Sequence, residues 1–210
     1  MIRNMRKVIP LFIFLLFAGV VKTYAEPDDF GIWSTFNLKY NFTPKIYGST
    51  YLEFRSKQNT QRMDCFIARQ YLGYNWTSWL KTDVAYDFIK SPSTVHNRLL
   101  VSATATLKEG NFSFSLRERY LYDYKVAQRS GENVLRSKAS INYHIKNTPL
   151  TPYVAIEMFT WDHWKKTRHY AGTHIKLDKH STLDFFYMYY TMSDKNFQRH
   201  LLGLGYILKL

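Results

Sequence analysis

Residues 112–123, Phe-Ser-Phe-Ser-Leu-Arg-Glu-Arg-Tyr-Leu-Tyr-Asp, alternate between apolar or aromatic side chains and polar or charged ones. Phe112, Leu116 and Tyr120 fall on one parity, whereas Arg117 and Arg119 fall on the other. A period of two residues is typical of a β-strand with one apolar face and one polar face. This stretch therefore predicts a two-faced strand.

The same alternation recurs on both sides of this stretch. Nine segments show it: 46–57, 80–89, 98–107, 112–123 and 135–145, and the segments that contain 154–158, 171–177, 183–189 and 202–210. Two further segments, 30–40 and 64–76, bring the set to eleven. On the apolar parity of the nine segments the single charged residue is Glu118. Repeated two-faced segments separated by turn residues predict an all-β chain.

Segment length and aromatic content favour a membrane barrel over a soluble one. Alternation is common to both classes, because a soluble barrel turns its apolar face inward and a membrane barrel turns it outward. The segments run for about 10–13 residues, as a tilted transmembrane strand requires. Aromatic residues make up 18% of the chain and gather near the expected strand ends, as interfacial girdles do. These aromatics are Tyr40, Phe42, Trp76, Trp79 and Phe112 at one rim and Tyr86, Phe88, Tyr120, Tyr122, Trp161, Trp164, Tyr187 and Tyr189 at the other.

The connections are expected to alternate in length. Short turns at 41–45, 75–78, 108–111, 146–151 and 178–181 alternate with longer loops at 57–64, 90–97, 124–133, 162–169 and 193–198. Outer-membrane barrels have short periplasmic turns and longer extracellular loops. We therefore expect a closed antiparallel transmembrane up-and-down β-barrel of about 10–12 strands. Bacterial single-chain barrels have even strand numbers, so one of the eleven segments is misassigned or the first joins the wall in an unusual way.

The N-terminal residues predict export. Arg3, Arg6 and Lys7 precede an apolar run over 8–21, and Thr23-Tyr24-Ala25 is a small-x-small cleavage site. This three-part pattern is that of a secretory signal peptide. We expect a signal peptide at 1–25, a barrel domain at 26–210 and a location in the cell outer membrane. Without the leader the chain has 25 basic and 16 acidic residues.

The last residues of the chain resemble the C-terminal signal read by the outer-membrane barrel assembly machinery. That signal consists of a glycine followed by apolar residues at alternate positions up to the end. Gly205, Leu208 and Leu210 fit it. The final residue is usually aromatic, and here it is leucine. The assembly machinery is therefore an expected partner during insertion.

Four short motifs resemble a known family. They are Asp29-Phe30-Gly31-Ile32-Trp33, Glu53-x-Arg55, Arg69 followed by Leu72-Gly73-Tyr74, and Leu116-Arg117-x-Arg119-Tyr120. Together they are similar to domain-of-unknown-function family 2490 (DUF2490). The resemblance covers nearly the whole chain after the leader. It implies an exported outer-membrane β-barrel of Gram-negative bacteria, common in Bacteroidetes, and it implies no activity or catalytic residues.

The polar parity predicts a charged lumen. The expected lumen charges are Glu53, Arg55, Arg69, Lys81, Asp83, Asp87, Arg98, Arg117, Arg119, Asp123, Arg136, Lys138, Glu157, Lys176 and Asp184. Charges in a narrow lumen must pair or stay hydrated, because an unpaired buried charge is costly. Two interpretations follow: a salt-bridged plug, since small barrels are filled by side chains, or a narrow pore that favours anions.

Basic residues also predominate at the loop side. The outer leaflet presents phosphate-bearing lipopolysaccharide, and exposed Lys or Arg beside anionic headgroups gains about 1 kcal/mol each. We expect lipid-phosphate contacts from Lys165, Lys166 and Arg168. Solvated loop charges without a partner are the alternative. The oligomeric state is left open by the sequence.

Other chemistries find less support. His163, His169, His174 and His180 are close in sequence but lack metal-ligand spacing, and the one cysteine, Cys65, has no partner, so no metal or cofactor is expected. Nucleic acid is not an expected partner, because the chain is exported. Ser93, His96, Ser130, His163, His169 and Ser193 lie in or beside the expected long loops. Sequence cannot show whether a nucleophile and a base meet there, and GxSxG is absent, so no catalytic residues are assigned.

The sequence thus favours a structural or narrow channel-type outer-membrane barrel with a charged, largely plugged lumen. Two alternatives stay open. One is an outer-membrane lipid hydrolase or acyltransferase, whose site would lie in the loops. The other is a soluble exported barrel that binds an apolar ligand.

Overall fold

The computed structural model describes residues 29–160, 164–192 and 197–210. The expected signal peptide, Trp161 and His163 lie outside this part of the chain. Within it, no helix is long and apolar enough to cross a membrane.

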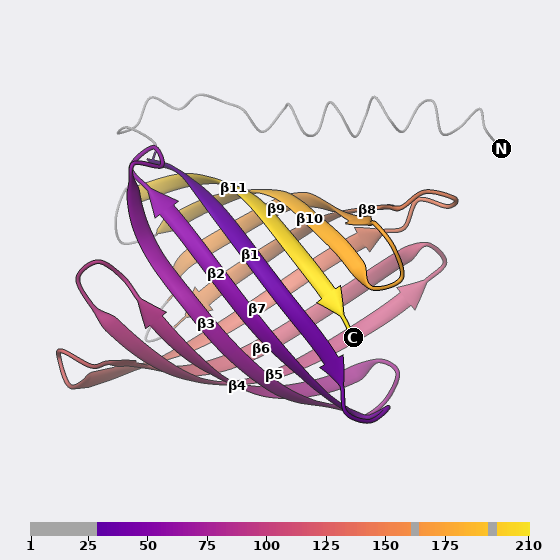
Figure 1. Cartoon of the computed structure of the whole chain (residues 1–210), viewed down its shortest axis with the longest axis horizontal. Helices are drawn as coiled ribbons and strands as arrows, with labels where there is room; N and C mark the ends of the chain where they lie inside the picture. Colours follow the sequence, from indigo (N-terminus) through magenta and orange to yellow (C-terminus); the bar gives the residue numbers. More distant parts are fainter. Residues whose placement is uncertain (1–28, 161–163, 193–196) are drawn as a thin grey trace.

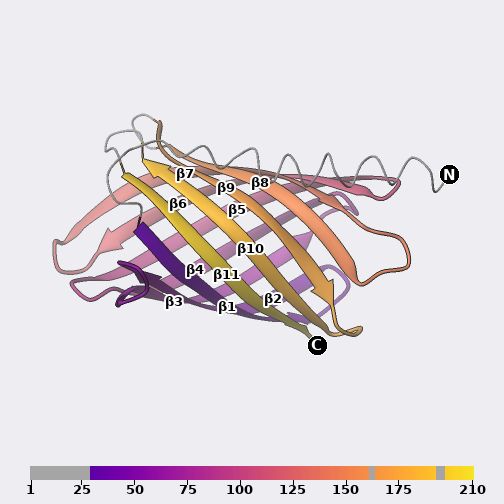
Figure 2. The ribbon, with the colours of Figure 1, turned by 90° about the horizontal axis from the view of Figure 1, so that it is seen from above.

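The described residues form eleven strands that close into one barrel (Figures 1 and 2). They are β1 (Asp29–Asn41), β2 (Ile46–Lys57), β3 (Arg62–Asn75), β4 (Leu80–Lys90), β5 (Val95–Glu109), β6 (Phe112–Lys125), β7 (Ser130–Tyr143), β8 (Leu150–Thr160), β9 (Trp164–Lys176), β10 (Ser181–Met192) and β11 (Phe197–Lys209). Each strand pairs with its sequence neighbours, so the fold is the closed barrel that the alternation predicts.

The barrel closes through a parallel pair. β1 runs parallel to β11, from Asp29 opposite Arg199 to Lys39 opposite Lys209, whereas all other strand pairs are antiparallel. Strands that alternate in direction leave the first and the eleventh pointing the same way, so an odd number requires one parallel seam. No segment was misassigned, and the first strand joins the wall in an unusual way.

Both ends of the barrel carry short connections. The segments 58–61, 91–94 and 126–129, expected within longer loops, are no longer than the turns 42–45 and 76–79. The ladder simply continues through polar residues, with Lys57 opposite Arg62 and Lys125 opposite Ser130. Polar composition therefore ended the predicted strands too early, because backbone pairing does not require apolar side chains. The expected difference in loop length is wrong for these connections.

We name the two ends by their connections. The turn-side rim carries 42–45, 76–79 and the end of β11, and the loop-side rim carries 58–61, 91–94 and the start of β1. The start of β1 and the end of β11 therefore lie at opposite ends of the barrel (Figure 1).

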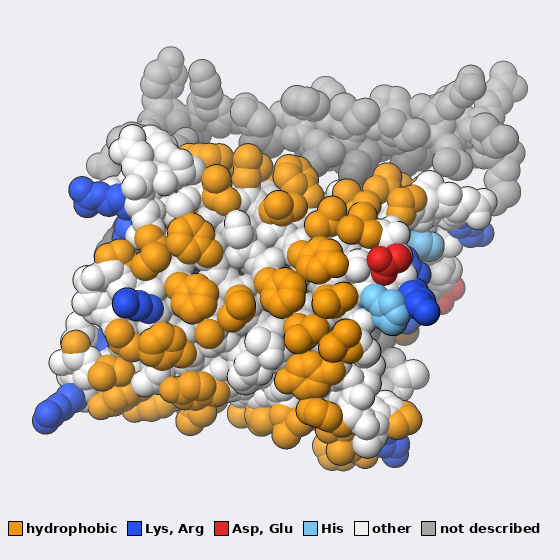
Figure 3. Space-filling view, in the orientation of Figure 1, with side chains coloured by type: hydrophobic (Ala, Val, Ile, Leu, Met, Phe, Trp, Pro, Cys, Tyr) orange, Lys and Arg blue, Asp and Glu red, His pale blue; other side chains and the backbone are white. Residues whose placement is uncertain are grey.

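The outer surface is apolar. Leu107, Leu99 and Phe185 are 66%, 61% and 52% exposed, whereas inward residues such as Arg119 and Glu157 are 3% and 1% exposed. In the view of Figure 3, apolar side chains cover the middle of the outer face, and charged ones lie towards its ends. This is the inverse of a soluble barrel and is the arrangement of a transmembrane one.

Two apolar clusters fill part of the interior. Trp33, Tyr170, Phe186, Met188 and Leu201 form one, and Ala85, Leu100, Leu121, Val134 and Phe159 form the other. Gly203 makes room for the first cluster, since a Cβ at that position would lie 2.0 Å from the ring of Phe186. The remaining interior is charged.

Candidate functional site: the charged lumen

The inward faces of the strands enclose a cavity of about 530 Å³. Eleven basic side chains line it: Lys39, Arg55, Arg69, Lys81, Arg98, Arg117, Arg119, Arg136, Lys138, Lys166 and Arg168. Six acidic side chains line it: Glu53, Asp83, Asp123, Glu132, Glu157 and Asp184. The lumen is therefore charged along its length, with an excess of positive charge.

Thirteen of the fifteen expected lumen charges line this cavity. They are Glu53, Arg55, Arg69, Lys81, Asp83, Arg98, Arg117, Arg119, Asp123, Arg136, Lys138, Glu157 and Asp184. Asp87 does not line it but is fully buried in the wall, where it pairs with Arg69. Lys176 also lies outside the cavity, because it ends β9 at the turn-side rim and is exposed there.

The expectation that Lys166 and Arg168 contact lipid phosphate is wrong. β9 begins at Trp164, so both residues belong to the wall and their side chains line the lumen. Arg168 is 6% exposed, and the ammonium of Lys166 lies 4.3 Å from the centroid of the Phe159 ring. Extending the alternation of 171–177 backwards by five positions, to Lys166, would have placed both on the inward parity. The side chain of Lys165 lies outside the described part of the chain.

Glu157 organises the first group of lumen charges. Its Oε1 accepts hydrogen bonds of 2.8 Å from Arg117 Nη2 and Arg136 Nη2. Its Oε2 accepts hydrogen bonds of 3.3 Å from Arg168 Nη1 and 3.1 Å from the Tyr170 hydroxyl. One carboxylate on β8 thus connects β6, β7 and β9. Three guanidinium groups surround a single negative charge, so the group is net positive.

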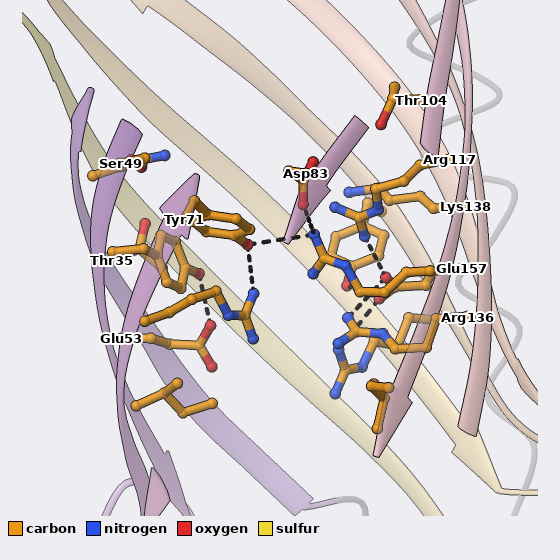
Figure 4. Close-up of a pocket in the computed structure, with 18 of the residues that line it drawn as sticks. Thr35, Ser49, Glu53, Tyr71, Asp83, Thr104, Arg117, Arg136, Lys138 and Glu157 are labelled. Atoms are coloured by element: carbon orange, nitrogen blue, oxygen red, sulfur yellow. Dashed lines mark hydrogen bonds and ion pairs between the residues drawn. The ribbon is translucent and has the colours of Figure 1, made fainter. Parts of the chain in front are cut away.

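Arg119 belongs to a second group of lumen side chains, which lies between Glu157 and the opposite wall of the barrel. Its Nε donates to Ser102 Oγ at 2.8 Å, and its Nη2 lies 3.4 Å from the Tyr71 hydroxyl and 3.9 Å from Asp83 Oδ1. Tyr71 also accepts a hydrogen bond of 2.7 Å from Arg69 Nη1. Figure 4 shows the contacts of Tyr71 and Asp83 between the wall that carries Glu53 and the wall that carries Glu157. These side chains narrow the lumen.

Aromatic rings support several of the cations. The guanidinium carbon of Arg55 lies 4.0 Å from the centroid of the Trp33 ring, and that of Arg168 lies 5.2 Å from it. Arg136 lies 4.5 Å from the centroid of the Phe159 ring. Such contacts stabilise a cation without neutralising it. Trp33 and Phe159 were not expected in the lumen, since apolar residues on the polar parity read as interruptions of the pattern.

The guanidinium groups keep unused donors. Among the described residues, the buried Nε atoms of Arg55, Arg98, Arg117, Arg136 and Arg168 have no hydrogen-bond partner. Buried donors normally find partners in protein, water or a ligand. At the turn-side mouth Lys39 and Lys81 are exposed and extend the positive lining to the opening. The lumen therefore suits small anionic groups.

The other expected features occupy different places. Among the described residues no three His, Cys, Asp or Glu side chains are grouped to hold a metal ion. Gly205 lies beside Thr35 in the wall, and Leu208 pairs with Leu38 and Ser181. Leu210 follows the end of β11, is 70% exposed, and donates its backbone N–H to Lys39 O at 2.9 Å.

The barrel is similar to solved porin structures, and its sequence matches a known family. It is similar to a "NanC porin" structure, with a TM-score of 0.53 and 12% identity over 86% of this chain and 99% of that one. It is also similar to a "KdgM porin in complex with disordered oligogalacturonate", with a TM-score of 0.51 and 13% identity over 79% and 90% of the two chains. No curated protein matches the sequence. The family described as "Protein of unknown function (DUF2490)" matches residues 30–200, and the chain belongs to that family.

Proposed function

We propose that this protein is an outer-membrane β-barrel that acts as a narrow, anion-preferring channel. The observation that carries the proposal is the lining of the lumen, where eleven basic side chains face six acidic ones. Rings of Lys and Arg are typical of pores that select anions. The exposed Lys39 and Lys81 support it further, because they extend the positive lining to the turn-side mouth, where an anion would enter.

The size of the lumen limits the solute. The contact between Arg119 and Tyr71 and the arginines around Glu157 leave a cavity of about 530 Å³. We expect small anionic solutes to pass and large steady currents to be absent. The similar KdgM porin was solved with oligogalacturonate, a carboxylate-bearing chain, and small acidic sugars are therefore a reasonable first class to test.

Reversal potentials in planar bilayers test this function. The full chain, folded in detergent and inserted between KCl solutions of unequal concentration, is expected to give small currents with a reversal potential of the sign for chloride. Replacing Lys39 and Lys81 by Gln is expected to reduce that preference, because both line the turn-side mouth. Replacing the exposed Lys146, in the connection between β7 and β8, is the matched control. Cation preference in the wild type would contradict the proposal.

The outer-membrane location also belongs to this proposal. The leader at 1–25, insertion by the barrel assembly machinery and contact with lipopolysaccharide all depend on it. Within the described part of the chain, the exposed loop-side cations available for lipid phosphate are Arg62, Lys90 and Arg129. Lys125 pairs with Glu132, and Arg199 pairs with Asp29 and Asp64. Cell fractionation is expected to recover the protein in outer membranes. Recovery in the detergent-free periplasmic supernatant would contradict this and favour a soluble exported barrel.

A further inference from the structure

A chain of four polar side chains lies at the loop-side end of β5 and β6, apart from the Glu157 group. Asp123 Oδ1 lies 3.2 Å from His96 Nδ1, and His96 Nε2 lies 2.6 Å from Thr94 Oγ1. Thr94 Oγ1 is in turn 3.0 Å from Ser91 Oγ. The order is carboxylate, imidazole, hydroxyl. From these contacts we infer a hydrolytic site for carboxylic esters, with Thr94 as the nucleophile.

The tautomer of His96 follows from its partners. A carboxylate only accepts hydrogen bonds, so in the neutral imidazole Nδ1 carries the proton and donates a hydrogen bond to Asp123. Nε2 is then an acceptor and faces the hydroxyl of Thr94. This is the arrangement in which a hydroxyl loses its proton to a neighbouring base as it attacks a carbonyl carbon. Asp123 is a positioning residue, and its Oδ2 also forms an ion pair with Arg98, 2.6 Å from Nη2.

The local fold explains why these groups meet. Thr94 immediately precedes β5, and His96 and Arg98 follow at alternate positions, so the three share one face of the chain. Arg98 is directly opposite Asp123 in the β5–β6 ladder. The side chains of His96 and Asp123 are 18% and 12% exposed, so the relay is held by its surroundings but open to a substrate.

The site borders the positive lumen. Asp123 and Arg98 both line the cavity, and the buried Nε of Arg98 has no hydrogen-bond partner among the described residues. Arg98 forms an ion pair with Asp123, which contacts His96 Nδ1, whereas Thr94 contacts His96 Nε2. Arg98 therefore helps to hold the carboxylate that orients the imidazole. An ester whose acid part or alcohol part carries a negative charge would also be attracted by the surrounding cations.

The reaction balances with water as the second reactant. Thr94 Oγ1 bonds to the acyl carbon while its proton moves to His96 Nε2, and the C–O bond to the alcohol then breaks as the leaving oxygen takes that proton. Water next attacks the acyl carbon and gives a proton to Nε2. The bond to Thr94 breaks and the threonine oxygen recovers the proton. Acid and alcohol are the products, and no oxidation occurs.

Hydrolysis of p-nitrophenyl butyrate by the full chain in detergent tests the assignment. Thr94→Val and His96→Asn are each expected to lower kcat/KM by about 100-fold or more, the usual contribution of a positioned base. Thr94→Ser is expected to keep activity. Asp123→Asn is expected to lower kcat with little change in KM, and Asp123→Glu to restore part of it. Folding of each variant is checked by its gel mobility before and after boiling.

His144→Asn is the matched control. His144 Nδ1 lies 3.3 Å from the Thr151 hydroxyl at the turn-side rim, so it is a histidine–threonine contact outside the relay. Its rate is expected to equal that of the wild type. Mass spectrometry of acid-quenched protein is expected to find a butyryl group on Thr94. Equal rates of hydrolysis by the wild type and by Thr94→Val would overturn the inference.

Discussion

Glu157 is a buried carboxylate that contacts three arginines of the lumen. Its side chain is 1% exposed and bonds to Arg117, Arg136 and Arg168. Glu157→Gln is expected to lower the free energy of unfolding by about 3–5 kcal/mol, because removing one partner leaves buried charges uncompensated. Urea unfolding in lipid bilayers measures this loss.

The control for that variant is Glu132→Gln. Glu132 pairs with Lys125 at 2.8 Å, but its side chain is 47% exposed. Solvent screening leaves such a pair worth about 0–1 kcal/mol, so the unfolding curve is expected to change little. Equal losses in the two variants would show that burial of the Glu157 group does not determine stability.

Glu118, unlike Glu157, is a carboxylate on the outer surface of the barrel. It is exposed on the outward parity of β6, and its Oε2 accepts a hydrogen bond of 2.6 Å from Ser137 Oγ. A carboxyl group on the lipid face is unfavourable compared with an apolar side chain. Glu118→Leu is therefore expected to stabilise the barrel by roughly 1–2 kcal/mol in a bilayer. The same urea titration measures it, and a destabilised variant would place Glu118 in contact with something other than lipid.

At the scale of the strand, β11 combines closure and assembly. Leu208 faces outward beside Leu38 of β1, and Leu210 follows it by two positions. Replacing both by Asp is expected to leave export intact and to block insertion, because both belong to the apolar end of the terminal strand. Lys209→Asp is the control, since it lies between them on the other parity. Normal outer-membrane levels of the double variant would contradict the proposed signal.

Alternation predicted the strands better than it predicted their ends. In 112–123 the alternation correctly places Arg117 in the lumen and Leu116 on the outer surface. A shift of one residue would have exchanged the two faces. The polar stretches at 57–64 and 124–133 read as loops, and their ladders became visible only in three dimensions. The same limit hid Lys166 and Arg168, which lie at the beginning of β9.

The contacts across the lumen could not be predicted at all. Arg117 and Glu157 are 40 positions apart and meet because β6 and β8 curve towards each other around β7. Thr94, His96 and Asp123 meet through the register of β5 with β6. Parity says which side chains enter the lumen, whereas barrel closure decides which of them touch.

At the scale of the whole molecule, closure itself has a measurable signature. A barrel in which every strand has two neighbours leaves no open edge for detergent to invade. We expect unboiled samples in dodecyl sulfate to migrate differently from boiled ones, because the closed form unfolds only on heating. Identical migration of the two samples would contradict a closed barrel.

The parallel seam between β1 and β11 constrains how the chain can be rearranged. In a barrel with an even strand number the first and last strands are antiparallel neighbours, so a short linker can join the termini and new ends can be opened at another turn. Here Asp29 and Leu210 lie at opposite rims. A linker between them would have to run the full height of the barrel, through the lumen or through lipid. Circular permutation, which many β-barrels tolerate, is therefore not expected to succeed with this barrel.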